Sequence, residues 1–80
     1  MELKIGSVVR AKAGRDKDGF FAVTAVEKDF CYIADGKSRK LLSPKRKNIK
    51  HISLTSSMID INDITDKKLR TLLKSFGGEE

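Results

Sequence analysis

Cysteine and histidine, which supply many nucleophiles and metal ligands, each occur once in this 80-residue chain, as Cys31 and His51. One cysteine cannot form a disulfide within the chain, and no spacing of histidine, cysteine and carboxylates matches a metal site. Cys31 lies between Phe30 and Tyr32, where a thiol is usually buried and inert. A Cys–His nucleophilic pair stays open as an alternative, but these surroundings favour a chain that is not an enzyme and needs no metal or cofactor.

Long apolar runs are also missing. No segment approaches the roughly 20 apolar residues that span a bilayer, and the N-terminus lacks the apolar region of a signal peptide. We therefore expect a cytoplasmic protein with no membrane partner. Tryptophan is absent, and four phenylalanines and one tyrosine are the whole aromatic set, so most aromatic side chains are expected in the core.

Acidic residues are absent from residues 36–59, which hold seven lysines and arginines. Residues 1–35 balance six basic against six acidic side chains, and residues 60–80 hold four basic and five acidic, so the net charge of +6 comes from the central stretch. A localised basic excess indicates a polyanionic partner: nucleic acid, an anionic membrane face or an acidic protein. A solvated lysine surface is the alternative, which the complete lack of acid here disfavours.

The first two-thirds of the chain has the pattern of short strands. So short a chain predicts one domain with a thin core, since it buries only about 60–65% of its unfolded surface. Asp35-Gly36 favours a two-residue hairpin turn, and Pro44 should end the strand that follows, because proline cannot donate to a ladder. Strands are predicted at residues 7–13, 20–27, 30–34, 37–42 and 48–54. Five short strands at this spacing predict a small closed barrel.

The last third changes to helical spacing. An apolar stripe at i, i+3, i+4 and i+7 is formed by Leu69, Leu72, Leu73 and Phe76. This stripe predicts a helix over 63–76, capped by Asn62, Asp63 or Thr65 and followed by Gly77 at the C-terminal cap position. We expect the stripe to pack on the barrel; docking to a partner protein is the alternative. The expected organisation is a barrel at 1–54, a connector at 55–62, the helix at 63–76 and a tail at 77–80.

A strand, a glycine-containing loop with a lysine and a second apolar strand occupy residues 6–26, and this stretch resembles a KOW motif. Gly14 matches the central glycine of the motif, Lys17 the lysine after it and Val23 an apolar strand position. Over residues 3–54 the chain is similar to the large-subunit ribosomal protein fourteen family of eukaryotes and archaea, and to small bacterial KOW-domain proteins. The similarity rests on Ala-Gly-Arg-Asp-Lys at 13–17, Ile-Ala-Asp-Gly-Lys at 33–37, Arg-Lys-Leu at 39–41 and Pro-Lys-Arg-Lys-Asn-Ile-Lys-His at 44–51. The resemblance implies an SH3-like barrel that binds RNA in connection with the ribosome.

These observations together predict a mainly β domain, an SH3-like five-stranded barrel with one C-terminal helix, that binds RNA phosphates without catalysis. The expected partner is RNA, with ribosomal RNA as the first candidate and ribosomal proteins as further partners of a monomer. Tyr32 is the candidate for stacking on an unpaired base. The expected RNA-contacting residues are Arg15, Lys17, Lys37, Arg39, Lys40, Lys45, Arg46, Lys47, Lys50 and His51. A protein–protein interaction module that uses the barrel and the helix stripe is the alternative function, and a DNA-binding SH3-like barrel is a third possibility.

Overall fold

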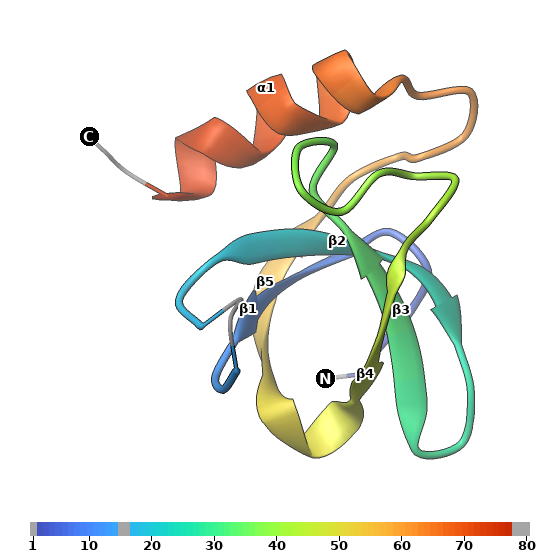
Figure 1. The fold of residues 1–80 in the computed structure, drawn as a ribbon, viewed down its shortest axis with the longest axis vertical. Coiled ribbons are helices and arrows are strands. Elements are labelled where there is room, and N and C mark those ends of the chain that lie inside the picture. Colours follow the sequence, from blue (N-terminus) through green and yellow to red (C-terminus); the bar gives the residue numbers. More distant parts are fainter. Residues whose placement is uncertain (1, 15–16, 78–80) are drawn as a thin grey trace.

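A computed structural model describes residues 2–14 and 17–77 of the chain. Five antiparallel strands form one sheet in the order β4-β3-β2-β1-β5, and a single helix, α1, follows them. The elements are β1 (Ser7–Ala11), β2 (Phe20–Val26), β3 (Phe30–Ala34), β4 (Lys45–Asn48), the 3₁₀ turn η1 (Ile49–His51), β5 (Ile52–Met58) and α1 (Asp66–Gly77). The sheet curls on itself, with η1 linking its two edge strands (Figure 1). The fold is therefore mainly β with one C-terminal helix, consistent with a small SH3-like barrel.

The curled sheet buries side chains on both of its faces, which explains why β1 does not alternate cleanly. Val9 and Ala11 lie in the inner core with Phe21, Val23 and other apolar side chains. Val8 points to the opposite face, where it packs under α1. Val8, which interrupts the period-2 pattern of this strand, is thus apolar because it packs against the helix.

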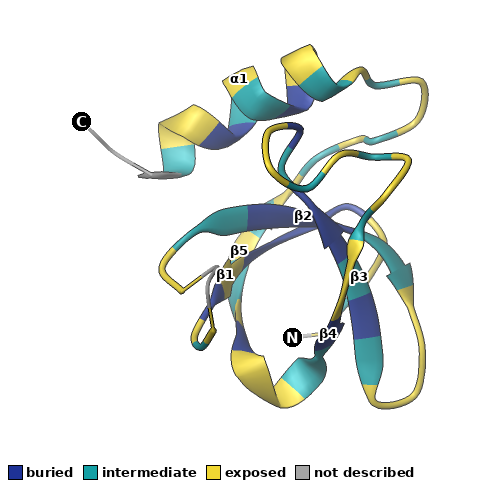
Figure 2. Cartoon of the chain, viewed as in Figure 1, coloured by how far each residue is buried: buried dark blue, intermediate teal, exposed yellow. Residues whose placement is uncertain are grey.

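Helix α1 covers the outer face of the sheet with its apolar side (Figures 1 and 2). Leu69 is fully buried and Leu73 is 6% exposed, and both belong to an outer core with Ala22 and Ala34. Leu72 and Phe76 are half-buried. The stripe therefore packs within the chain, which leaves little of it for a partner protein.

The helix begins three residues later than its pattern predicts. Asp63 has a φ of 57°, in the left-handed region that a helix does not use, so residues 62–63 form a turn before the helix begins. Thr65 is the cap, because its Oγ1 accepts a hydrogen bond from the Lys68 amide at 3.1 Å. The helix ends at Gly77, and residues 78–80 of the expected tail lie outside the described residues.

The strand expected at 37–42 is wrong, and so is the role given to Pro44. The Asp35 carboxylate accepts hydrogen bonds from the Lys37 and Arg39 amides, each at 2.8 Å. These bonds fold residues 35–39 into a turn closed by a side chain, a known alternative to a strand ladder. Of the Asp35-Gly36 pair, Gly36 alone has a positive φ, so the turn is not the type I′ turn that the pair suggests.

The fourth strand lies instead at β4, which pairs with β3 and directly follows Pro44. The fifth strand also differs from its expected range of 48–54. Residues 49–51 form η1, and β5 then runs to Met58 because it pairs with β1 as far as Ser7. The connector therefore lies at residues 59–65 and not at the expected 55–62.

The loop between β3 and β4 docks on the first turn of α1. The Leu41 amide donates to Asp66 Oδ1 at 2.8 Å, and Arg70 Nη1 donates to the Gly36 carbonyl at 2.9 Å. Gly36 lies so close to the helix that an added Cβ would collide with the backbone of Asp66. This loop and the helix therefore hold each other in place.

Gly36→Ala is expected to lower the free energy of unfolding by about 2–4 kcal/mol, because it adds a strained φ of +76° to a backbone collision. Gly14→Ala is the matched control: its φ of +81° is equally unfavourable, but its Cβ would meet only the Lys47 ammonium, at 3.2 Å. Denaturant unfolding of both variants measures the difference. Equal losses for the two would show that the loop does not depend on close contact with the helix.

Within the described ranges, no helix is long and apolar enough to cross a lipid bilayer.

Candidate nucleic-acid interface

Strand β4 carries three consecutive cations on an edge of the sheet. Its partners across the ladder are Ile33 for Lys45, Tyr32 for Arg46 and Cys31 for Lys47. Because directly paired residues lie on the same face of a sheet, Arg46 shares a face with Tyr32, while Lys45 and Lys47 are on the side of Ile33 and Cys31. Lys45 is exposed there because it is the first residue of the strand, whereas Lys47 is buried. The strand therefore separates its basic side chains instead of presenting all three together.

Lys47 is buried, so its assignment as an RNA contact is wrong. Its side chain is turned inward beside Cys31, the residue is 8% exposed, and its Nζ donates a hydrogen bond to the Ala13 carbonyl at 2.9 Å. The strand period aims alternate residues inward, and the loop carbonyl satisfies the ammonium that results. Lys47 therefore ties the β1–β2 loop to β4 and is not available to a phosphate.

Arg46 points outward and is held over an aromatic ring. Its guanidinium carbon lies 3.8 Å from the centre of the Phe30 ring, in cation–π geometry, and its Nε is 3.7 Å from Glu27 Oε1. About half of the Arg46 side chain is exposed. The guanidinium group is thus already held in place, so that binding a ligand through it costs little conformational entropy, and it is still accessible to solvent. Tyr32 is the half-buried neighbour of Arg46 across the strands, so base stacking on it stays a prediction.

The turn η1 and the β1–β2 loop extend this basic surface. The Lys12 amide donates to the His51 carbonyl at 2.8 Å, which places the start of the loop beside the turn. Lys50 and His51 are exposed on η1, and Lys12 and Lys17 are exposed on the loop. Arg15, a further predicted contact, lies outside the described residues. We call this surface the basic edge; it comprises Lys12, Lys17, Lys45, Arg46, Lys50 and His51.

The basic edge contains few compensating acids. Arg46 is its one member with an ion pair among the described residues, and that pair is long, to an exposed Glu27. The nearby Asp18 is bound elsewhere, since its Oδ1 accepts a 2.6 Å hydrogen bond from Arg10. Asp29 lies beside Lys50, in the hollow between the β2–β3 turn and η1, so the edge keeps a positive excess that these acids reduce only in part.

Lys37, Arg39 and Lys40 do not belong to the basic edge. They lie on the loop that docks on α1, with Lys37 and Lys40 exposed and Arg39 half-buried. The continuous basic stretch of the sequence is thus divided over two surfaces. On the second surface, Lys37 shares a groove with Arg70 and Lys74 of the helix, two cations that the sequence pattern did not connect with RNA.

Cys31 and His51 have different surroundings. Cys31 is fully buried in the inner core, and desolvation raises the pKa of its thiol, which opposes formation of the thiolate that a nucleophile needs. His51 is exposed on η1. Among the residues with described positions, no group of three histidine, cysteine or carboxylate side chains is placed to hold a metal ion.

A scan of the sequence against protein-family models gives no match, and a search among curated proteins gives none either. The KOW resemblance therefore stays a prediction that rests on the residues quoted for it.

Proposed function

We propose that this chain is a non-catalytic RNA-binding module, associated with translation, that holds RNA phosphates on the basic edge. The observation that carries the proposal is that two segments bearing six basic residues, β4–η1 and the β1–β2 loop, are joined by the Lys12–His51 and Lys47–Ala13 hydrogen bonds. Most of these six residues make no ion pair within the described residues. Such a set neutralises several phosphates at once and gains affinity from the counterions that it releases.

The fold fixes these cations before RNA arrives. Lys45 and Arg46 extend from a strand, Asn48 Oδ1 accepts the Lys50 amide at 2.9 Å at the start of η1, and Lys47 anchors the facing loop. Side chains placed on ordered backbone lose less entropy on binding than those on a mobile tail. Phosphate contacts of this type orient a protein on nucleic acid without reading its sequence.

RNA is favoured over DNA by the KOW resemblance, since charge alone suits both. The half-buried Tyr32 beside Arg46 adds a ring on which an unpaired base can stack, a contact typical of recognition of RNA loops and bulges. The absence of catalysis is proposed from the buried, protonated thiol of Cys31 and from the solvent-exposed position of the lone histidine.

The protein-docking alternative has weaker support in the structure. It depends on the apolar stripe of α1, and two of its four residues, Leu69 and Leu73, are buried against the sheet. We therefore base no proposal on that stripe.

The test is an affinity titration of the whole chain against a hairpin RNA, an unpaired RNA and a duplex DNA of matched length, each at several salt concentrations. We expect tighter binding to RNA, with a slope of log affinity against log salt between about −3 and −5, as for four to six phosphate contacts. Weak binding that is equal for all three nucleic acids and vanishes near physiological salt would contradict the proposal.

A further inference from the structure

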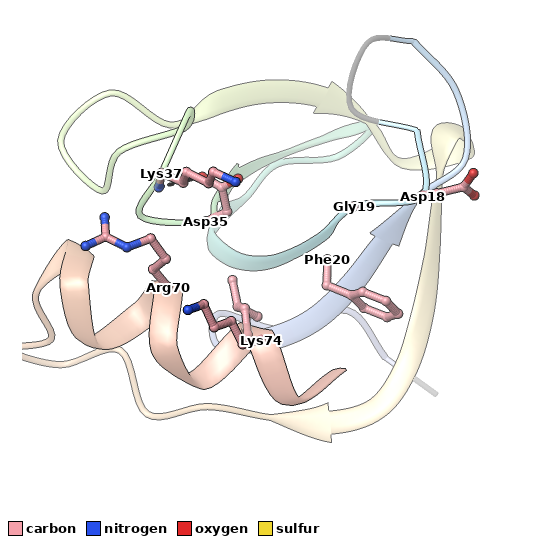
Figure 3. A pocket seen from close by; sticks show the side chains of 8 residues that line it. Asp18, Gly19, Phe20, Asp35, Lys37, Arg70 and Lys74 are labelled. Carbon is pink, nitrogen blue, oxygen red and sulfur yellow. Dashed lines mark hydrogen bonds between the residues drawn. The ribbon is translucent and has the colours of Figure 1, made fainter. Parts of the chain in front are cut away.

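A groove lies between α1, the β3–β4 loop and the start of β2, next to the basic edge (Figure 3). Its volume is about 400 Å³, near the lower end of the roughly 300–1,000 Å³ range of small-molecule sites. The β1–β2 loop borders both surfaces, because Lys17 belongs to the basic edge while Asp18 and Gly19 line the groove. A chain bound on the edge can therefore reach the groove without leaving the protein surface.

Three cations surround the groove. Arg70 and Lys74 are one helical turn apart on α1, so they lie on the same face of the helix, and Lys37 approaches from the facing loop (Figure 3). The Arg70 guanidinium is fixed by its 2.9 Å hydrogen bond to the Gly36 carbonyl. Neither Lys37 nor Lys74 forms an ion pair with any residue in the described ranges.

The two acids of the groove are already bound within the protein. Asp35 accepts the Lys37 and Arg39 amides and lies 3.4 Å from Ser38 Oγ. Asp18 pairs with Arg10 at 2.6 Å, and in Figure 3 its carboxylate points away from the cations. Asp35 is bound by neutral amide and hydroxyl groups and keeps its charge, so three cations face one uncompensated carboxylate and the groove retains a positive excess for an anion from outside.

The apolar part of the groove is the half-buried ring of Phe20, at the start of β2. Phe76 packs against this ring, with ring centres 6.3 Å apart. Leu73 also lines the groove, but it lies on α1 beside Lys74 and is 6% exposed, so it offers little surface. An anionic ligand that also presents a flat apolar face would satisfy both the cations and the ring. A nucleotide has this combination, with a phosphate for the cations and a base for the Phe20 ring.

We propose that this groove receives one unpaired nucleotide, its phosphate among Lys37, Arg70 and Lys74 and its base against the Phe20 ring. The inference rests on the proposed function for its source, an unpaired nucleotide of the RNA bound on the basic edge. It assigns a role to α1, which lies outside the KOW resemblance: the helix completes a site that gives the module a preference for unpaired positions.

The test compares two RNA hairpins that differ by a single-nucleotide bulge, with AMP as the free nucleotide. Wild-type protein should bind the bulged hairpin roughly tenfold more tightly than the paired one, as expected for one stacked base. Lys37→Glu with Lys74→Glu should abolish this preference. Both residues are exposed, so the fold should persist, and the neutral pair Lys37→Gln with Lys74→Gln repeats the test without charge reversal.

Lys4→Glu with Lys68→Glu is the matched control, because it makes the same change of charge at exposed positions that neither line the groove nor belong to the basic edge. This control should keep the tenfold preference. Equal affinity of wild type for the two hairpins, or an equal loss in both double variants, would overturn the inference while leaving RNA binding by the basic edge intact.

The titration with AMP distinguishes a free nucleotide from a nucleotide of the bound RNA as the ligand of the groove. AMP binding that the Lys37/Lys74 variants remove would support the groove as a nucleotide site even if neither hairpin bound. Failure of wild type to bind either hairpin would contradict the proposed function, and failure to bind AMP as well would overturn both proposals.

Discussion

Lys45→Glu combined with Lys50→Glu is expected to weaken RNA binding on the order of 50-fold at 0.1 M salt. Each lysine that neutralises a phosphate contributes a factor of nearly ten at this salt concentration through counterion release. The slope of log affinity against log salt should also become shallower by about two. Because both side chains are exposed, the thermal unfolding midpoint should stay nearly unchanged. Fluorescence anisotropy and thermal unfolding measure the two quantities on the same preparations.

The control for this experiment is Lys67→Glu with Lys68→Glu. It alters the net charge by the same amount on a helix that covers the opposite face of the sheet from the inner core. Its affinity loss should be several-fold smaller, since exposed charges beyond about 10 Å are screened at this salt. Equal losses would mean that net charge, and not the basic edge, governs binding.

Lys47→Glu is expected to destabilise the fold strongly, by about 3 kcal/mol or more. The substitution removes the hydrogen bond to the Ala13 carbonyl and places a carboxylate at a buried position facing that carbonyl. A loss of this size lowers the unfolding midpoint of a domain this small by roughly 12 °C or more. Denaturant unfolding checks the free energy directly.

Two variants define the cause of that loss. Lys47→Met keeps the apolar stem and should cost less, about 1–3 kcal/mol, for the lost charged hydrogen bond. Lys45→Glu, two positions away on the same strand but exposed, should cost almost nothing. A Lys47→Glu protein as stable as wild type would show that this ammonium does not tie the loop to β4.

The difference between Lys45 and Lys47 shows why the site could be predicted only in outline. In the sequence both belong to one basic run, and composition gives each the same weight. Their exposure depends on where the strand begins, because Lys45 stands at its open end while Lys47 faces Cys31 and lies under the β1–β2 loop. That information comes from tertiary pairing, which a local pattern does not contain.

Strands β1, β2 and β3 and the helix stripe were predictable because the strands are rich in apolar, β-branched and aromatic residues and the stripe keeps helical spacing over two turns, although β1 ends earlier than predicted, at Ala11, and β2 at Val26. β3 matches its predicted range of 30–34, and Leu69 and Leu73 occupy the buried face. The strand predicted at 37–42 does not form, because two aspartates accept hydrogen bonds from backbone amides that a strand would use. Asp35 accepts from the Lys37 and Arg39 amides, and Asp66, far along the chain, accepts from the Leu41 amide.

The groove was hidden from sequence reasoning for a related reason. Arg70 and Lys74 share a helix face, which their spacing shows, but Lys37 joins them only because Gly36 packs directly against the helix backbone. The signal in the sequence was the glycine itself, at a position where any side chain would separate the loop from the helix.

The most direct test of RNA binding on the basic edge is a titration of ¹⁵N-labelled protein with unlabelled hairpin RNA, followed by amide chemical shifts. The proposal predicts that the largest changes fall at Lys12, Lys17 and residues 45–51, with a second group around Lys37 and residues 70–74 if an unpaired nucleotide is present. Changes centred instead on the end of β5 around Met58, with residues 45–51 unaffected, would contradict it.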